Sequence, residues 1–141
     1  MNITIENRDL FTVSQGYYLA HCISADFALG AGIAKKFDEV YNMRYKLFKN
    51  YDYYYFTGGE ALMVDNVFNL VTKPQCYDKP TYSTLREALE DMKDLMNVWD
   101  ITKLAMPKIG CGLDRLQWDK VYDIICDVFK DADVDILICE L

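Results

Sequence analysis

Short apolar runs alternate with amphipathic segments along this chain, and that alternation limits the folds available to it. Runs of strand length, rich in aliphatic and β-branched residues, occupy residues 3–5, 18–23, 61–64, 67–72, 104–106 and 136–139. Asp65 and Asn66 separate the third run from the fourth as a tight turn. Because such runs are typical of strands buried in a sheet, the pattern predicts six strands.

Apolar residues recur at helical spacing between several of these runs. The clearest helix is residues 83–98, with Thr84 and Glu87 at the spacing of a capping box. Residues 118–130 repeat the pattern, and two shorter helices are expected at 33–39 and 41–50. The side chains expected in the core include Leu85, Leu89, Met92, Met96, Trp99, Leu116 and Trp118. Strands alternating with helices predict an α/β domain, with helices on both faces of a largely parallel or mixed sheet.

The chain is long enough for one well-packed domain. At 141 residues, folding buries roughly two-thirds of the surface that the unfolded chain exposes. No repeat or low-complexity linker divides it, and the first residues lack a signal-peptide pattern. We expect a single soluble domain over residues 1–141, intracellular and monomeric, with no membrane association.

Cysteine and histidine usage argues against metal binding. The five cysteines include no Cys-x-x-Cys pair, which disfavours a disulfide framework and a structural zinc site. Free thiols, buried or half-buried in a reducing compartment, are the simple interpretation. A nucleophilic Cys111 would depend on the only histidine, His21, which lies in an apolar run and is expected in the core.

The charge balance restricts the class of ligand. A formal net charge of -7 disfavours extended nucleic-acid binding. A small anion held by backbone amides remains compatible with it. The one local cluster of cations is expected to be the solvated face of helices: Lys35, Lys36, Arg44, Lys46 and Lys49.

Two glycine loops, residues 24–32 and 108–115, each follow a predicted strand and precede a predicted helix. Loop amides and helix N-termini at such positions favour bound anions. Neither loop is a GxGxxG motif or a P-loop. Taken alone, the loops fit ordinary strand-to-helix connections and phosphate binding about equally well.

Six sequence blocks, in order, resemble the macrodomains, specifically the small single-domain ADP-ribose glycohydrolases of the terminal ADP-ribose protein glycohydrolase type. The blocks are residues 9–11, 20–24, 30–34, 72–73, 79–82 and 106–118. The last is long and unusual in composition. The resemblance implies a three-layer α/β/α sandwich with a central mixed, largely parallel sheet, and ADP-ribose in a cleft above it.

The resemblance also implies which residues bind the ligand. Asp9 would accept a hydrogen bond from the adenine amino group, with Leu10 beside it. Ser24 would offer its hydroxyl, and loop backbone its amides, to the distal ribose and the phosphates. The remaining binding residues would be Gly30, Ala31, Gly32, Ile33 and Ala34 in the first loop and Ile109, Gly110, Cys111, Gly112 and Leu113 in the second.

Two further residues match the catalytic pair of that family. Lys73 would be the nucleophile, although a lysine that ends a strand is usually a solvent-facing charge. To attack it must lose a proton, which burial or a cation such as Lys79 or Arg115 would favour. Asp114 would handle protons, but with Gln117 it also has the spacing of a helix-capping box. Both roles remain open for Asp114.

The resemblance implies a hydrolase that removes ADP-ribose from acidic protein side chains through a covalent lysyl intermediate. Nucleobases and O-acetyl-ADP-ribose are further possible carriers. ADP-ribose is then ligand and product, no cofactor or metal is needed, and the partners are ADP-ribosylated proteins, with ADP-ribosylated nucleic acid as an option. A reader module without turnover and a nucleotide-binding domain of unrelated chemistry are the alternatives.

Overall fold

Six strands form one sheet in the order β1-β6-β5-β2-β4-β3. The computed structural model describes all 141 residues. All neighbouring pairs run parallel except β3 and β4, the hairpin at one edge. The strands are β1 (Asn2–Asn7), β2 (Tyr18–Ser24), β3 (Glu60–Val64), β4 (Val67–Lys73), β5 (Lys103–Met106) and β6 (Asp135–Glu140). All six predicted strands are confirmed.

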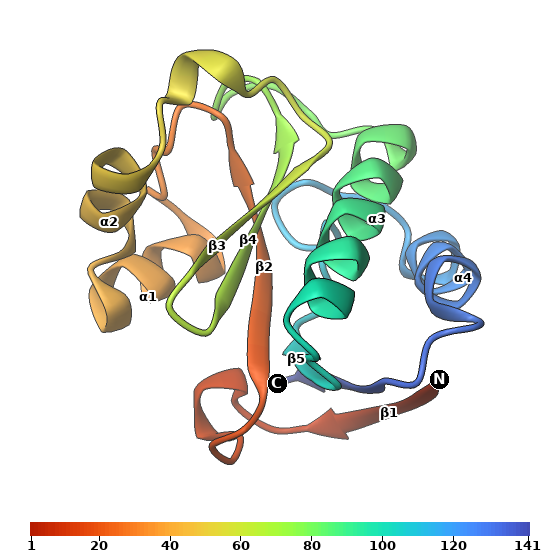
Figure 1. The fold of residues 1–141 in the computed structure, drawn as a ribbon. Helices are drawn as coiled ribbons and strands as arrows, with labels where there is room; N and C mark the ends of the chain where they lie inside the picture. Colours follow the sequence, from red (N-terminus) through yellow and green to blue (C-terminus); the bar gives the residue numbers. More distant parts are fainter.

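Four α-helices cover the two faces of this sheet. They are α1 (Gly32–Tyr41), α2 (Met43–Asn50), α3 (Tyr82–Val98) and α4 (Trp118–Phe129), with short 3-10 turns η1 (Leu10–Thr12) and η2 (Tyr53–Tyr55). Figure 1 shows α1 and α2 on one side of β2, β3 and β4, and α3 and α4 on the other. The predicted three-layer sandwich is confirmed.

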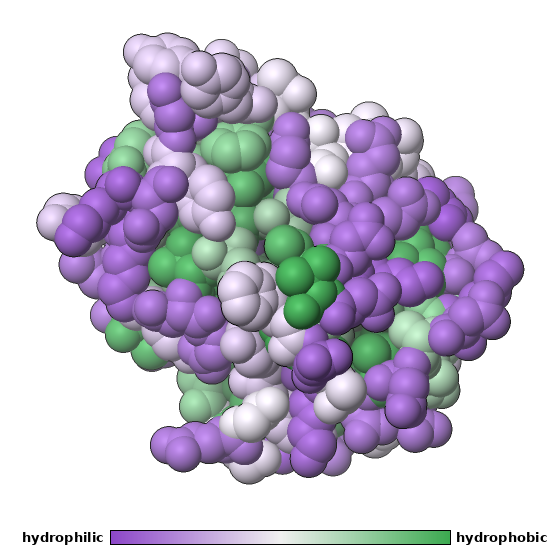
Figure 2. Space-filling view, in the orientation of Figure 1, coloured by the Kyte–Doolittle hydropathy of each residue, from purple (hydrophilic) through white to green (hydrophobic).

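Each face of the sheet has its own hydrophobic core. Under α3 and α4 the buried side chains include Phe68, Leu85 and Ile125, while Phe37 and Leu47 pack with others under α1 and α2. The outer surfaces of α3 and α4 are largely hydrophilic (Figure 2). No helix combines the length and the apolar character that a membrane span requires.

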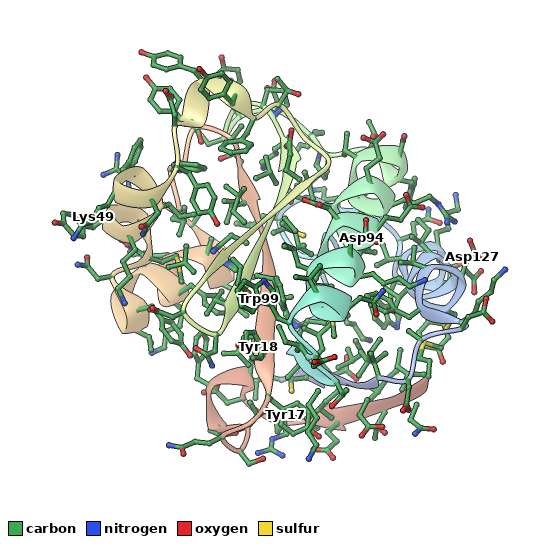
Figure 3. The ribbon with its side chains drawn as sticks, in the orientation of Figure 1. Tyr17, Tyr18, Lys49, Asp94, Trp99 and Asp127 are labelled. Carbon is green, nitrogen blue, oxygen red and sulfur yellow. The ribbon has the colours of Figure 1, made fainter.

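Two expectations about α3 are wrong. Its capping box consists of Thr81 and Thr84, three residues earlier than predicted, because the helix begins at Tyr82. Trp99 follows the last helical residue and is 61% exposed. It stands at the end of α3, in front of the sheet (Figure 3). By contrast, Trp118 is partly buried against the core, as expected.

The basic cluster on α1 and α2 is a solvated helix face, as expected. Lys46 pairs with Asp65 at 2.6 Å, and the Arg44 Nε donates to the carbonyl of Phe27 at 3.1 Å. Lys49 is exposed and points away from the sheet from the outer side of α2 (Figure 3).

His21 lies in the core, as expected. It is fully buried in β2, its ring stacks on Phe37 at 3.9 Å between centroids, and its Nε2 lies 2.6 Å from the amide oxygen of Asn69. Because that oxygen can only accept, Nε2 carries the proton. Burial lowers the pKa of His21 to about 4, although the hydrogen bond that His21 donates to Asn69 opposes the shift.

Acidification should therefore destabilise the fold through His21. Its pKa is depressed on folding, so its contribution is complete above its ordinary pKa of 6.5 and is lost as the pH falls toward 4. Between about pH 7.5 and about pH 5, His21 should account for about 2 kcal/mol of lost unfolding free energy. Urea titration at both pH values should show a smaller loss in His21→Gln than in the wild type. Equal losses would contradict this assignment.

Candidate active site

The order of the strands brings three chain segments together at the carboxyl ends of β2, β4 and β5. β2 lies between β5 and β4, all three parallel, so the loops after β2 and β5 meet the end of β4. A shift in register between Ile23 and Ser24 then pairs Ser24 with Lys73. Loops at the carboxyl ends of adjacent parallel strands are the usual place for a ligand in this class of fold.

A cavity of about 520 Å³ opens at these strand ends. It brings together most of the residues predicted for the site, although their contacts with a ligand stay predictions. The predicted residues that line it are Ser24, Gly30, Ala31, Gly32, Ile33, Ala34, Lys73, Ile109, Gly110, Gly112, Leu113 and Asp114. Cys111 does not line it, because its thiol turns back to donate to the carbonyl of Ile109 at 3.3 Å.

Gly110 shapes the turn between β5 and α4. Its φ of +72° lies in the left-handed region, and a Cβ at this position would approach the Leu116 side chain to 2.8 Å. The turn is closed by a hydrogen bond from the Leu116 amide to the Gly110 carbonyl at 2.8 Å. A side chain at Gly110 would therefore strain the backbone and collide with a core residue.

Substituting Gly110 should thus cost more than substituting its neighbour. We expect Gly110→Ala to lower the unfolding free energy by about 1–2 kcal/mol. The matched control is Gly112→Ala, where φ is not in the left-handed region and an added Cβ meets nothing within 4 Å. Thermal unfolding of both variants would test this, and equal destabilisation would contradict it.

Lys73 and Asp114 form an ion pair in the wall of the cavity. The distance from Lys73 Nζ to Asp114 Oδ1 is 2.7 Å, and the side chains are only 14% and 16% exposed. The solvent-facing alternative for Lys73 is therefore wrong. So is the capping alternative for Asp114: the N-cap of α4 is Gln117, without any side-chain capping bond.

The cavity gathers positive charge in an acidic protein. Besides Lys73 it is lined by Lys79 and Lys108, against the single carboxylate of Asp114. Lys79 Nζ donates to the carbonyl of Leu113 at 3.4 Å, and Lys108 pairs with Glu140 at 2.6 Å. Lys79 is thus the lining lysine that has no carboxylate partner, and its charge favours an anionic ligand. The sequence suggested that a cation, Lys79 or Arg115, would lie beside Lys73. The charged group in contact with Lys73 is instead the carboxylate of Asp114, and Arg115 does not line the cavity.

A second cavity, of about 380 Å³, adjoins the first. Both are lined by Ile33, Pro107 and Lys108. Asp9 and Leu10 line the second, so the residues predicted to bind the adenine lie in a cavity next to the one lined by the two glycine loops. One carboxylate oxygen of Asp9 accepts from the Phe11 amide at 2.9 Å and caps η1.

Two thiols of the first cavity were not predicted as part of it. Cys22 is in its wall, where burial, with the charge of Asp114, raises its pKa to about 12. Cys76 is exposed at the rim, contrary to the expectation of buried thiols. Burial also raises the pKa of Cys111, so neither Cys22 nor Cys111 is a thiolate at neutral pH.

Sequence reasoning also missed Ala28, Leu29, Pro107 and Lys108 as cavity residues. All four lie in or beside the two glycine loops, so their place in the chain was a usable signal. Cys76 and Lys79 come from the loop after Lys73; no signal in the sequence indicated Cys76, and Lys79 was suggested only as a cation near Lys73, not as a cavity residue. His, Cys, Asp and Glu side chains form no group of three that could hold a metal ion.

The sheet order, the helices and the loop-lined cleft define an α/β domain of the macrodomain class. The macro domain family model matches residues 20–125, and the chain belongs to this family. It is 40% identical to the ADP-ribose glycohydrolase OARD1 of Bos taurus, over 99% of this chain and 91% of that protein. The protein of the same name from Homo sapiens is 39% identical over the same shares.

Solved structures share the fold at lower identity. The macrodomain of Mycobacterium tuberculosis DarG superimposes with a TM-score of 0.83 at 23% identity, covering 99% of this chain and 97% of that one. Thermosipho africanus DarTG in complex with ADP-ribose gives a TM-score of 0.79 at 17% identity, over 99% of this chain and 42% of that one.

Proposed function

We propose that this protein hydrolyses the bond between ADP-ribose and an acidic protein side chain. Relatives that match nearly its whole length are named ADP-ribose glycohydrolases. The observation that carries the proposal is the Lys73–Asp114 ion pair, which faces the cavity between the two glycine loops. The diphosphate lies against these loops, and the ribose carbon that reacts lies at Lys73 Nζ.

The first step forms a covalent bond to the enzyme. Asp114 accepts a proton from Lys73 Nζ across the 2.7 Å contact, which frees the nitrogen lone pair. That pair attacks the anomeric carbon of the distal ribose. A C–N bond forms, the C–O bond to the substrate breaks, and the acidic side chain leaves as a carboxylate with the bonding electrons.

The second step releases ADP-ribose. Asp114, having passed its proton to solvent, accepts a proton from water as the water oxygen bonds to the anomeric carbon. The C–N bond breaks, its electrons return to Nζ, and the proton moves from Asp114 to the amine. The ion pair is thereby restored.

The alternative is a reader that binds ADP-ribose without turnover. A reader needs the two loops and the adenine cavity but no reactive amine beside a carboxylate. The largely buried Lys73–Asp114 pair at 2.7 Å favours the enzyme, because keeping two charges in a cavity wall has a desolvation cost that a binding site made of loops alone does not require.

The test is a release assay with the full chain. A protein ADP-ribosylated on glutamate is incubated with the enzyme, and free ADP-ribose is measured; arms with an ADP-ribosylated oligonucleotide and with O-acetyl-ADP-ribose define the range of carriers. We expect multiple turnovers on the glutamate-linked substrate. Tight binding of ADP-ribose without release from any carrier would establish the reader instead.

A further inference from the structure

Asp26 connects the first glycine loop with the loop that follows Lys73. Its Oδ1 accepts from the Ser24 hydroxyl and from the Ala28 amide at 3.1 Å, and its Oδ2 accepts from the Cys76 amide at 3.0 Å. Ala28 belongs to the first glycine loop and Cys76 to the loop after Lys73. Asp26 therefore holds both loops together at the mouth of the cavity.

This arrangement fixes the direction of the Ser24 hydroxyl. Burial alone raises the pKa of Asp26, but the hydrogen bonds from Ser24, Cys76 and Ala28 outweigh it, so the pKa lies below its usual value. An ionised carboxylate can only accept, so Ser24 must donate its single proton to Asp26. Toward the cavity, Ser24 presents oxygen lone pairs and no donor.

Ser24 lies beside the reacting centre. It is 5% exposed, lines the cavity and pairs with Lys73 in the sheet. The amide of Ala25 also donates to the carbonyl of Lys73 at 2.9 Å, which fixes the two strand ends against each other. The cavity wall at Ser24 therefore adjoins the strand end that carries Lys73, and a ligand group bound there lies next to the lysine.

The chemistry of ADP-ribose then identifies the partner of Ser24. Phosphate oxygens are acceptors, so they gain nothing from a second acceptor. The ribose hydroxyls are the O–H donors at the reacting end of the molecule. An acceptor buried beside Lys73 thus fits a ribose hydroxyl and disfavours a phosphate, which narrows the two contacts that the resemblance implies for Ser24 to the distal ribose.

We propose that Asp26 is a positioning residue that holds Ser24 as an acceptor for a hydroxyl of the distal ribose, and so makes that free hydroxyl a requirement of the site. The inference rests on the proposed function only in taking ADP-ribose as the ligand. A distal ribose that carries a substituent on this hydroxyl has no proton to donate and is discriminated against.

Calorimetric binding tests the proposal without any turnover. The ligands are ADP-ribose and two analogues whose distal ribose lacks the 2- or the 3-hydroxyl. We expect the wild type to bind one analogue about tenfold more weakly than ADP-ribose. In Ser24→Ala and in Asp26→Asn, this preference should fall to near unity, because the asparagine amide allows Ser24 to turn its proton toward the cavity.

A matched control separates the effect on the Ser24 hydroxyl from any general effect of replacing an aspartate by an asparagine. Asp38 also accepts a backbone amide, that of Arg44 at 2.9 Å, but does not line the cavity. Asp38→Asn should keep the full hydroxyl preference. The proposal is overturned if the wild type discriminates against neither analogue, or if Asp26→Asn discriminates as the wild type does. Should Asp26→Asn not fold, Ser24→Ala decides: an undiminished preference in that variant overturns the proposal.

Kinetics of the full reaction give an independent test, in which wild type and Asp26→Asn are compared on substrates with and without the recognised hydroxyl. On a glutamate-linked substrate with an intact ribose, Asp26→Asn should lower kcat/KM roughly 10- to 100-fold. On the substrate that lacks the recognised hydroxyl, the same substitution should have little effect; equal losses on both substrates would make Asp26 merely structural. Wild-type protein that shows the hydroxyl preference but releases no ADP-ribose refutes the hydrolase and leaves this inference standing.

Discussion

Lys73→Ala should release ADP-ribose from a glutamate-linked substrate at least about 10³-fold more slowly than the wild type. The variant lacks the only amine in contact with Asp114, so the covalent step cannot occur. The measurement is the initial rate of ADP-ribose release at saturating substrate, with the folded state checked by thermal unfolding. Substrate binding should weaken far less than kcat, because the loop amides remain.

Two companion variants make this result specific. Lys73→Arg keeps a cation beside Asp114 but presents a guanidinium, which stays protonated and cannot attack. It should be as inactive as Lys73→Ala while retaining the fold. Lys93→Ala removes a lysine from α3, away from the cavity, and should keep wild-type activity. Substantial activity in Lys73→Arg would rule out a lysine nucleophile.

Asp114→Ala is expected to stall the reaction at the covalent stage. Without Asp114, the carboxylate that stabilises the Lys73 ammonium is gone, so solvent can take the proton and the first step proceeds. No group then activates water, and turnover should fall roughly 10²- to 10⁴-fold. Intact-mass spectrometry should show one ADP-ribosyl group added to the protein, and peptide mapping should place it on Lys73.

The pair of outcomes distinguishes the two roles assigned to the ion pair. A variant with both substitutions, at Lys73 and Asp114, should form no adduct and should be no slower than Lys73→Ala alone, because the two groups act in one sequence of steps. An unmodified Asp114→Ala protein under conditions where the wild type turns over robustly would remove Lys73 as the nucleophile.

The elements of secondary structure were readable from local patterns. Short apolar runs predicted all six strands, and apolar spacing predicted the longer helices; all four α-helices were found, and no boundary differs from its prediction by more than two residues. The errors concern ends: the cap of α3 lies at Thr81, and Trp99 is exposed just beyond the helix. Local spacing identifies the apolar face of a helix well, but it does not show at which residue that face ceases to be buried against the sheet.

Most residues of the candidate site were predicted from the two glycine loops and from the resemblance, but several residues that line the cavity were not. Lys108 and Leu29 were overlooked although they lie in or beside those loops. Cys76 reaches the cavity from a different strand end, and the hydrogen bond that its amide donates to Asp26 joins residues fifty positions apart in the chain. Such partners are set by strand order, which adjacent residues do not encode.

By itself, the sequence determined the α/β class, the helices and strands, the two glycine loops and, through its resemblance, Lys73 and Asp114 as candidates. The tertiary structure decided what those side chains do to each other. It paired Lys73 with Asp114 rather than using Asp114 as a cap, and it turned the Ser24 hydroxyl toward Asp26. The reason is physical: propensity and periodicity are local, whereas the partner of a charge and the direction of a hydrogen bond depend on which strand ends meet in the sheet.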